Sequence, residues 1–269
     1  MKCKNWPIGV CSWSLQTDIA GVADAMKRIG IDHVHLGIRP AVEDKNVLIQ
    51  IEKQVWTITS TMIDFPQEDY STFDSIKVTG GIVPDDCWER NLKLFMGALD
   101  ATAVLGMDYL SMHAGFIDES DEQRSKKFIS RIRTLADAAE EKNITLLLET
   151  GQETAEELRN FLEKLDHPAL AVNFDPANMI LYAKGDPVEA VHTLGPWIEH
   201  VHIKDALRTK QPGTWGQEVA WGDGQVRTGL FLDALDDIGF DGALAIEREA
   251  GDSRFDDIKH AAEMLSSMD

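Results

Sequence analysis

The chain is poor in cysteine, and this shortage argues against a disulfide scaffold or a cysteine-rich zinc site. Its 269 residues include three cysteines, Cys3, Cys11 and Cys87, an odd number without CxxC spacing. We interpret them as free thiols in a reducing compartment, each packed as a small hydrophobic side chain. The expected location is therefore cytoplasmic.

Positive charge is also scarce. Lys and Arg number 26 against 46 Asp and Glu, which gives a formal net charge of −20. Because this charge repels a phosphate backbone, we expect no extended binding to nucleic acid. A small anionic substrate is still compatible with the sequence, since a metal ion and a few cations can set the local field.

Long apolar runs are missing as well. No run approaches the roughly 20 residues that a membrane-spanning helix needs. The N-terminal residues carry positive charge, but a strand-like segment follows them instead of the apolar core of a signal peptide. We therefore predict no association with a membrane.

The chain does contain eight strand-like segments that alternate with amphipathic, helix-like ones. The predicted strands cover residues 8–14, 32–37, 55–63, 108–113, 144–149, 170–175, 198–202 and 243–247. The predicted helices cover residues 19–29, 44–54, 88–105, 122–142, 154–165, 229–238 and 255–268, with one more that opens at Asp186-Pro187. This order predicts an α/β fold, a single (β/α)8 TIM barrel that occupies residues 1–269 as one domain.

Two long segments rich in Gly and Pro interrupt this rhythm, at residues 64–86 and 204–227. Both are predicted to be loops, and loops of this length inside a compact domain are usually functional. The first follows the third predicted strand, so we expect it to cover the rim of the barrel as a mobile lid.

Four of the predicted strands end in a side chain that can bind a metal: Glu149, Asp175, His202 and Glu247. One such residue means little, because an acid after an apolar run is often a helix cap or a solvated loop residue. Four in succession are hard to explain in that way. Parallel barrels carry their active sites where the strands end, so these residues predict one site at the C-terminal rim.

Three carboxylates and one imidazole favour a fairly hard divalent cation. We expect Mn²⁺ first, with Co²⁺, Mg²⁺ or Zn²⁺ as alternatives. Four protein ligands leave room for two substrate oxygens, so a hydroxy-ketone could chelate the ion and become acidic at the adjacent C–H. Glu149 and Glu247 can face each other across such a substrate and act as a general acid–base pair. A rim salt bridge is the alternative role for either glutamate alone.

Several motifs carry a resemblance to a known family. They are LLETGQE (147–153), NFDPANM (173–179), HVHIKD (200–205), WGDG (221–224) and GFDGALAIE (239–247). The chain resembles the xylose-isomerase-like TIM barrels, a family of sugar-phosphate isomerases and epimerases that includes ketose 3-epimerases and L-ribulose- or L-xylulose-5-phosphate 3-epimerases. The resemblance implies a sugar or sugar-phosphate substrate and often a homo-oligomer. It also implies one divalent metal on the four rim residues, with the two glutamates as proton-transfer groups.

Four further residues are predicted to contact the substrate. His113 ends a strand at the same rim, and Lys204 follows the metal-binding histidine closely. The resemblance adds Arg208, six residues beyond that histidine, and Asn178, where many relatives have a histidine. The chain also departs from the family at Ala155, where the epimerases carry a glutamate. These departures leave the substrate open.

A last departure lies in the second predicted strand, which often ends in a glutamate in this family. Here the corresponding stretch contains His33 and His35, and we assign at least His33 a structural role.

Three other functions compete with an epimerase. A lyase such as an inosose dehydratase would use the same metal and base to expel a hydroxyl group. A nuclease like endonuclease IV, with three zinc ions, needs more histidines than this rim offers and conflicts with the negative charge. A non-catalytic sugar-binding barrel would be expected to lose a carboxylate, yet all four are present.

Overall fold

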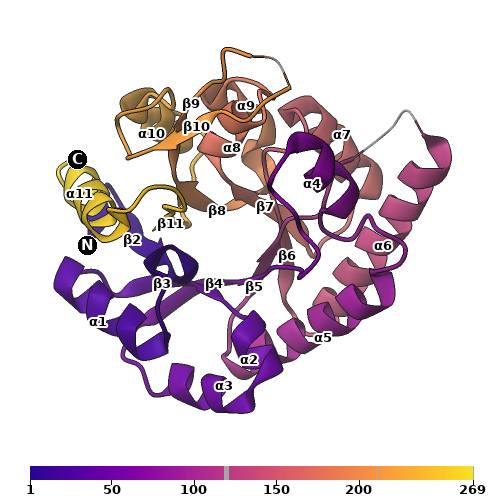
Figure 1. The fold of residues 1–269 in the computed structure, drawn as a ribbon, viewed down its shortest axis with the longest axis horizontal. Coiled ribbons are helices and arrows are strands. Elements are labelled where there is room, and N and C mark those ends of the chain that lie inside the picture. Colours follow the sequence, from indigo (N-terminus) through magenta and orange to yellow (C-terminus); the bar gives the residue numbers. More distant parts are fainter. Residues whose placement is uncertain (118–120, 212, 269) are drawn as a thin grey trace.

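The computed structural model describes residues 1–117, 121–211 and 213–268. Position 212 of the second predicted loop and position 269 of the predicted domain lie outside these ranges. Eight parallel strands pair in the order β2-β11-β8-β7-β6-β5-β4-β3, and a further pairing of β2 with β3 closes the ring. Figure 1 shows this ring with its helices around the outside, which confirms the predicted (β/α)8 barrel.

The barrel strands are β2 (Trp6–Cys11), β3 (His33–Gly37), β4 (Thr57–Ile63), β5 (Tyr109–Met112), β6 (Thr145–Glu149), β7 (Leu170–Phe174), β8 (Ile198–Ile203) and β11 (Ala243–Ile246). The short strand β1 (Lys2–Cys3) pairs with β2 in the antiparallel sense. The larger helices are α1 (Ile19–Ile29), α3 (Lys45–Glu52), α5 (Trp88–Val104), α6 (Glu122–Glu140), α7 (Ala155–Leu165), α9 (Pro187–Leu194), α10 (Thr228–Asp237) and α11 (Arg254–Ser266).

Local sequence signals account for several helix ends. The side chain of Asp18 caps the N-terminus of α1, and Gly30 ends that helix with a left-handed φ of 90°. Thr154 and Glu157 form a reciprocal capping box at the start of α7, as the predicted cap at Thr154 requires. The hydrophobic core lies between the strands and these helices, with Phe95 and Phe231 among its largest fully buried side chains.

The prediction that residues 64–86 form a loop without regular structure is wrong. They contain the helix α4 (Phe73–Thr79), which Figure 1 shows beside β6 and β7 at one side of the barrel. The hydroxyls of Thr72 and Ser75 cap this helix reciprocally. A capping box can be recognised in a sequence, but the surrounding Gly and Pro residues favoured the prediction of a loop.

The second predicted loop also contains regular structure. Residues 204–227 hold an antiparallel pair, β9 (Asp205–Leu207) and β10 (Gln217–Val219). The helices α2 (Arg39–Glu43) and α8 (Pro176–Leu181) were not predicted, because each is too short to show a helical period. The predicted first strand ends early, since residues Ser12–Leu15 form a 3-10 helix.

The two long rim segments meet above the barrel. Phe73 of α4 stacks on Trp215, with ring centroids 4.3 Å apart, and both rings contact Tyr182. Residues 64–86, which we call the lid segment after their predicted role, also reach the predicted site, because the Tyr70 ring lies 6.0 Å from the His113 ring. None of the helices in the described ranges combines the length and apolarity needed to cross a bilayer.

Candidate metal centre and active site

The fold brings the four predicted metal ligands together. Glu149 is the last residue of β6, His202 lies in β8, and Asp175 and Glu247 directly follow β7 and β11. Each offers a ligand atom, and these atoms all lie within 4.8 Å of one another. All four side chains are buried. Four neighbouring strands thus direct their last polar side chains at one point inside the C-terminal rim.

Several buried polar atoms of these four residues lack hydrogen-bond partners, as expected where a cation binds. Oε2 of Glu149, Oδ2 of Asp175 and Nδ1 of His202 are buried without a hydrogen-bond partner among the described residues. The His202 Nδ1 atom lies 3.4 Å from Glu149 Oε1, 3.4 Å from Glu247 Oε2 and 3.7 Å from Asp175 Oδ2. Buried polar atoms rarely go unpaired in proteins. This donor set therefore fits one divalent metal ion, bound by the three carboxylates and the imidazole.

Lys204 lies inside the same cluster. Its Nζ atom is 2.7 Å from Glu247 Oε2, 2.7 Å from Glu249 Oε2 and 3.6 Å from Asp175 Oδ2. Burial alone would raise the pKa of Glu247, but Lys204 and then His202 hold it well below its usual value. For Asp175, burial outweighs the attraction of Lys204 and raises the pKa. The lysine thus keeps one of the three carboxylates firmly ionised.

The two predicted proton-transfer groups have different surroundings. The indole N–H of Trp13 donates to Glu247 Oε1 at 2.7 Å, so both oxygens of Glu247 are bound. Asn178 donates its amide N–H to Glu149 Oε1 at 3.1 Å. The other oxygen of Glu149 lies 3.5 Å from Nε2 of His113. Glu149 therefore has the freer carboxylate oxygen.

The structure places three of the four predicted substrate-binding residues at the cluster. His113, Asn178 and Lys204 each contact one of the ligand carboxylates. Arg208 is different, because it is exposed and its guanidinium donates to the Gly185 carbonyl at 2.8 Å. Contact of these residues with a substrate stays a prediction.

Sequence reasoning gave no site role to Asp205, which holds the rim loop in shape. Its carboxylate accepts backbone N–H groups from Gly222, Gly224 and Val226 at 3.0–3.1 Å. A Cβ atom on Gly224 would lie 2.1 Å from Asp205 Oδ1, so only glycine fits there. These contacts tie the HVHIKD and WGDG segments to each other.

His35 of β3 is the second residue without a predicted site role. It is fully buried, and its Nδ1 atom lies 2.9 Å from Nε2 of the ligand His202. Asn173 also contacts that Nε2 atom, with its amide nitrogen at 3.1 Å. The sequence signal was the absence of a glutamate from the second predicted strand, whose corresponding stretch contains His33 and His35. His33 instead pairs with Asp32 at 2.8 Å, which agrees with a structural role.

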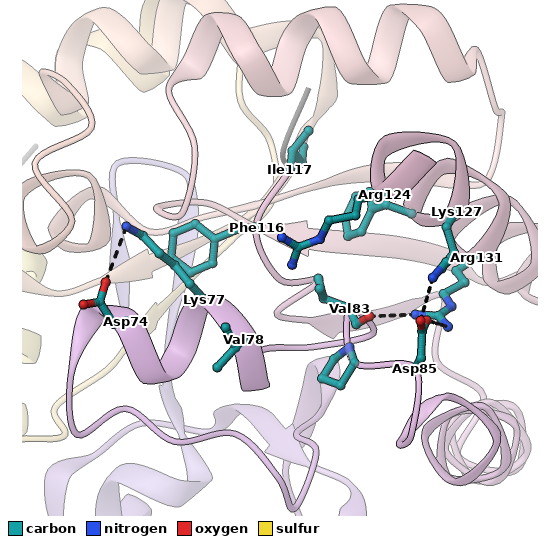
Figure 2. A pocket seen from close by; sticks show the side chains of 12 residues that line it. Asp74, Lys77, Val78, Val83, Asp85, Phe116, Ile117, Arg124, Lys127 and Arg131 are labelled. Carbon is teal, nitrogen blue, oxygen red and sulfur yellow. Dashed lines mark hydrogen bonds and ion pairs between the residues drawn. The ribbon is translucent and has the colours of Figure 1, made fainter. Parts of the chain in front are cut away.

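A cavity of about 800 Å³ lies away from this cluster, between α4 and α6 (Figure 2). The described residues that line it include none of the four rim-cluster residues. Its cations Lys127 and Arg131 both bind Asp85 at 2.6 Å, and Arg131 also donates to backbone carbonyls of the 82–83 turn. We therefore place the chemistry at the rim cluster and interpret these contacts as an anchor for the lid segment.

Comparisons with known proteins agree with this geometry. A xylose isomerase domain protein from Planctomyces limnophilus has a TM-score of 0.90 at 29% identity, covering 98% of this chain and 97% of that one. D-psicose 3-epimerase from Clostridium cellulolyticum H10 shares the fold with a TM-score of 0.72 at 15% identity, over 97% of this chain and 99% of that one.

A curated relative, 3-dehydroshikimate dehydratase of Bacillus anthracis, is 36% identical over 95 residues. This match spans 34% of the chain and only 33% of that protein. The family model for xylose isomerase-like TIM barrels matches residues 23–268. The chain thus belongs to the xylose isomerase-like TIM-barrel family.

Proposed function

We propose that the protein is a metal-dependent isomerase or epimerase of a sugar, which removes a proton from the carbon next to a carbonyl group. The observation that carries this proposal is the buried rim cluster, in which Glu149, Asp175, His202 and Glu247 leave three polar atoms unpaired around one point. A divalent ion there would polarise a substrate carbonyl and acidify the adjacent C–H.

The chain's own groups suit the proton transfers. Oε2 of Glu149 is buried and accepts no hydrogen bond from the described residues, so it can take a proton from one face of the substrate. Burial would lower the pKa of His113, but Glu149 and then Glu68 raise it. Its imidazole lies 3.5 Å from Glu149 Oε2, where it can hydrogen-bond a substrate oxygen. Glu247 would transfer a proton at the opposite face of the substrate, once its hydrogen bond to Trp13 or Lys204 breaks.

The cations near the site support an unphosphorylated substrate. Lys204 is already shared by two carboxylates, and Arg208 is engaged by a backbone carbonyl at the surface. A phosphate ester would have to compete for these partners. The aromatic cover of Phe73, Trp215 and Tyr182 suits the apolar face of a sugar instead.

A lyase that dehydrates its substrate is the second candidate. Two observations favour it: the local identity to 3-dehydroshikimate dehydratase and the unequal surroundings of the two glutamates. An epimerase needs a proton carrier on each face, whereas an elimination can proceed with one base. Lys204, held beside Glu247, would then stabilise negative charge near the departing hydroxyl.

Proton NMR in D₂O tests both candidates. The purified protein would be incubated with matched free and phosphorylated ketoses. One sample would contain Mn²⁺, and a second would contain Zn²⁺, because Zn²⁺ does not cause paramagnetic broadening. Deuterium incorporation with inverted configuration or with an aldose product supports the epimerase or isomerase, and an unsaturated or diketo product supports the lyase. Absence of both across ketoses and cyclic keto-polyols would contradict the proposed chemistry. Preference for the phosphorylated partners would contradict only the choice of substrate.

A further inference from the structure

The turn that follows β6 is fixed against the rim cluster. The Thr150 hydroxyl donates to the backbone carbonyl of Asp175 at 3.1 Å and accepts the Asp175 N–H at 2.8 Å. Gly151 has a positive φ of 131°, and a Cβ atom there would lie 2.3 Å from the Cβ atom of Asn178. Gln152 comes next in the chain, so the same contacts set its position three residues beyond Glu149.

Gln152 has a buried donor without an acceptor. The residue is 3% exposed, and its Nε2 atom has no hydrogen-bond partner among the described residues. Because an unpaired buried N–H group destabilises a protein, such groups normally find a partner in the chain, in water or in a ligand. The Gln152 amide is therefore available to an oxygen atom that a ligand brings.

The neighbours of Gln152 place this donor beside the rim cluster. Burial raises the pKa of the Tyr182 hydroxyl, and the nearby amide of Gln152 lowers it. Lys204 and Glu149 of the cluster also affect this pKa, so the hydroxyl lies near them as well. The Tyr182 ring packs edge-on against Trp215, with centroids 4.8 Å apart. The Trp215 indole Nε1 atom is likewise buried and unpaired within the described ranges.

The charges around these donors disfavour an anionic acceptor. Beyond burial, Glu149 and Glu68 raise the pKa of Tyr182, so negative charge surrounds this hydroxyl. The cation that opposes them, Lys204, is already bound by two carboxylates at 2.7 Å. A phosphate or carboxylate would be repelled here, whereas a neutral hydroxyl oxygen can accept the N–H groups without that cost.

We propose that Gln152 is a specificity-determining residue whose amide N–H donates to a hydroxyl group of the substrate, with the Trp215 indole as a second donor. This inference rests on the proposed function and narrows its substrate to a polyhydroxylated ketone that presents an uncharged hydroxyl at this position. Gln152 takes no part in proton transfer.

Substitutions combined with substrate analogues test this hydrogen bond. Gln152→Met keeps the length of the side chain without its donor, and Gln152→Asn keeps the amide on a shorter side chain. Gln50→Met is the matched control, because Gln50 is exposed on α3. The substrates are the ketose that incorporates most deuterium in the D₂O experiment and its monodeoxy analogues. Circular dichroism and thermal melting would establish that each variant is folded.

We expect Gln152→Met to raise KM about 10-fold and to leave kcat nearly unchanged, because one neutral hydrogen bond is lost from the bound ketose and its transition state alike. Gln152→Asn should show a similar loss, and Gln50→Met none. With wild-type protein, one deoxy analogue should lose about 10-fold in kcat/KM. That analogue should lose little further with Gln152→Met, since the bond is already absent. A purely structural role of Gln152 would instead affect all analogues alike.

NMR of the side-chain amide is a second measurement that needs no variant. The Gln152 amide signal of ¹⁵N-labelled, Zn²⁺-loaded wild type would be assigned by triple-resonance experiments. It should shift when the protein is saturated with the same ketose, and it should shift less with the deoxy analogue.

Three results would overturn the inference alone. They are an unchanged KM in folded Gln152→Met, additive losses for every deoxy analogue, or an amide signal that does not move at a saturating ketose concentration. The amide signal decides the matter if Gln152→Met does not fold. A wild-type protein that exchanges no ketose proton would overturn the proposed function together with this inference, so the two failures are distinguishable.

Discussion

Among the residues that the structure describes, two groups made of acidic and histidine side chains alone bring ligand atoms within 4.8 Å of one another, yet they differ in almost every other respect. The rim cluster consists of Glu149, Asp175, His202 and Glu247. A second group, which we call the base cluster, joins Asp137 and Glu140 of α6 to His167, which precedes β7 at the N-terminal end of the barrel.

The base cluster is solvated and its histidine is fully paired. The side chains of Asp137 and Glu140 are 60% and 56% exposed. The Nε2 atom of His167 pairs with Asp137 at 3.0 Å, and its Nδ1 accepts the Ala169 N–H at 3.1 Å. The rim cluster is buried and leaves three atoms unpaired among the described residues. Buried polar atoms without hydrogen bonds, more than residue type, therefore distinguish a candidate metal site from a structural surface contact.

The largest expected effect comes from the two rim glutamates. Glu149→Gln and Glu247→Gln keep one donor oxygen but remove charge and basicity, so each should lower kcat by about 10²–10⁴-fold even at saturating metal. The matched change Glu140→Gln in the base cluster should leave kcat unchanged. Recovery of both rim variants to near wild-type rates in excess metal would show that these residues are ligands only.

A smaller effect is expected on stability. An ion that binds only the folded protein stabilises it by about 2.7 kcal/mol at a free concentration of 100 times Kd. Thermal melting with and without Mn²⁺ should show this increase in the wild type and in Asp137→Ala. Asp175→Ala and His202→Ala should lose most of it, because each removes a ligand. An equal metal-induced increase in all four proteins would place the ion elsewhere.

A third prediction concerns pH and uses another buried rim acid. Burial raises the pKa of Glu153 from 4.5 to about 8, although Lys184 opposes this. The folded protein therefore holds this proton more tightly than the unfolded chain, and stability should fall as pH rises from about 4.5 to 8. The decline attributable to Glu153 is on the order of 5 kcal/mol, at about 1.4 kcal/mol per pKa unit.

Glu153→Gln should remove that part of the decline and make the protein more stable than wild type at pH 8. Urea unfolding at several pH values measures it. The exposed Glu140→Gln control should keep the wild-type slope. A Glu153→Gln variant whose slope matches that of the wild type would show that the Glu153 carboxyl is not held neutral.

The barrel and the convergence of the four rim side chains could be predicted because both depend on local patterns. The apolar runs that end at Glu149 and Glu247 mark buried parallel strands, and the ends of such strands meet at one rim. Contacts between side chains that are far apart in the sequence could not be predicted in the same way. Nothing in the local pattern of His35 shows that its ring reaches His202 across the barrel, 167 residues away in sequence.

The lid segment and Arg208 show a second limit. The α4 helix lies in a stretch whose Gly and Pro content is typical of a loop, and Glu68 fixes it through backbone N–H groups of Phe65 and Gly81. Arg208 occupies the position that the family resemblance favours, yet its side chain extends to Gly185 at the surface. Spacing fixes where a residue lies along the chain, whereas tertiary contacts decide where its side chain points.

The most direct test of the central claim is the metal content and location in the purified protein. Wild-type protein, stripped with a chelator and titrated with Co²⁺, should bind one ion at the rim cluster per chain, seen by calorimetry and visible absorption. Turnover should vanish on stripping and return with Mn²⁺ or Co²⁺. Asp175→Asn should abolish this tight site, and Asp137→Asn should retain it. The account would be contradicted by full activity in metal-free protein, or by a tight site lost in Asp137→Asn and kept in Asp175→Asn.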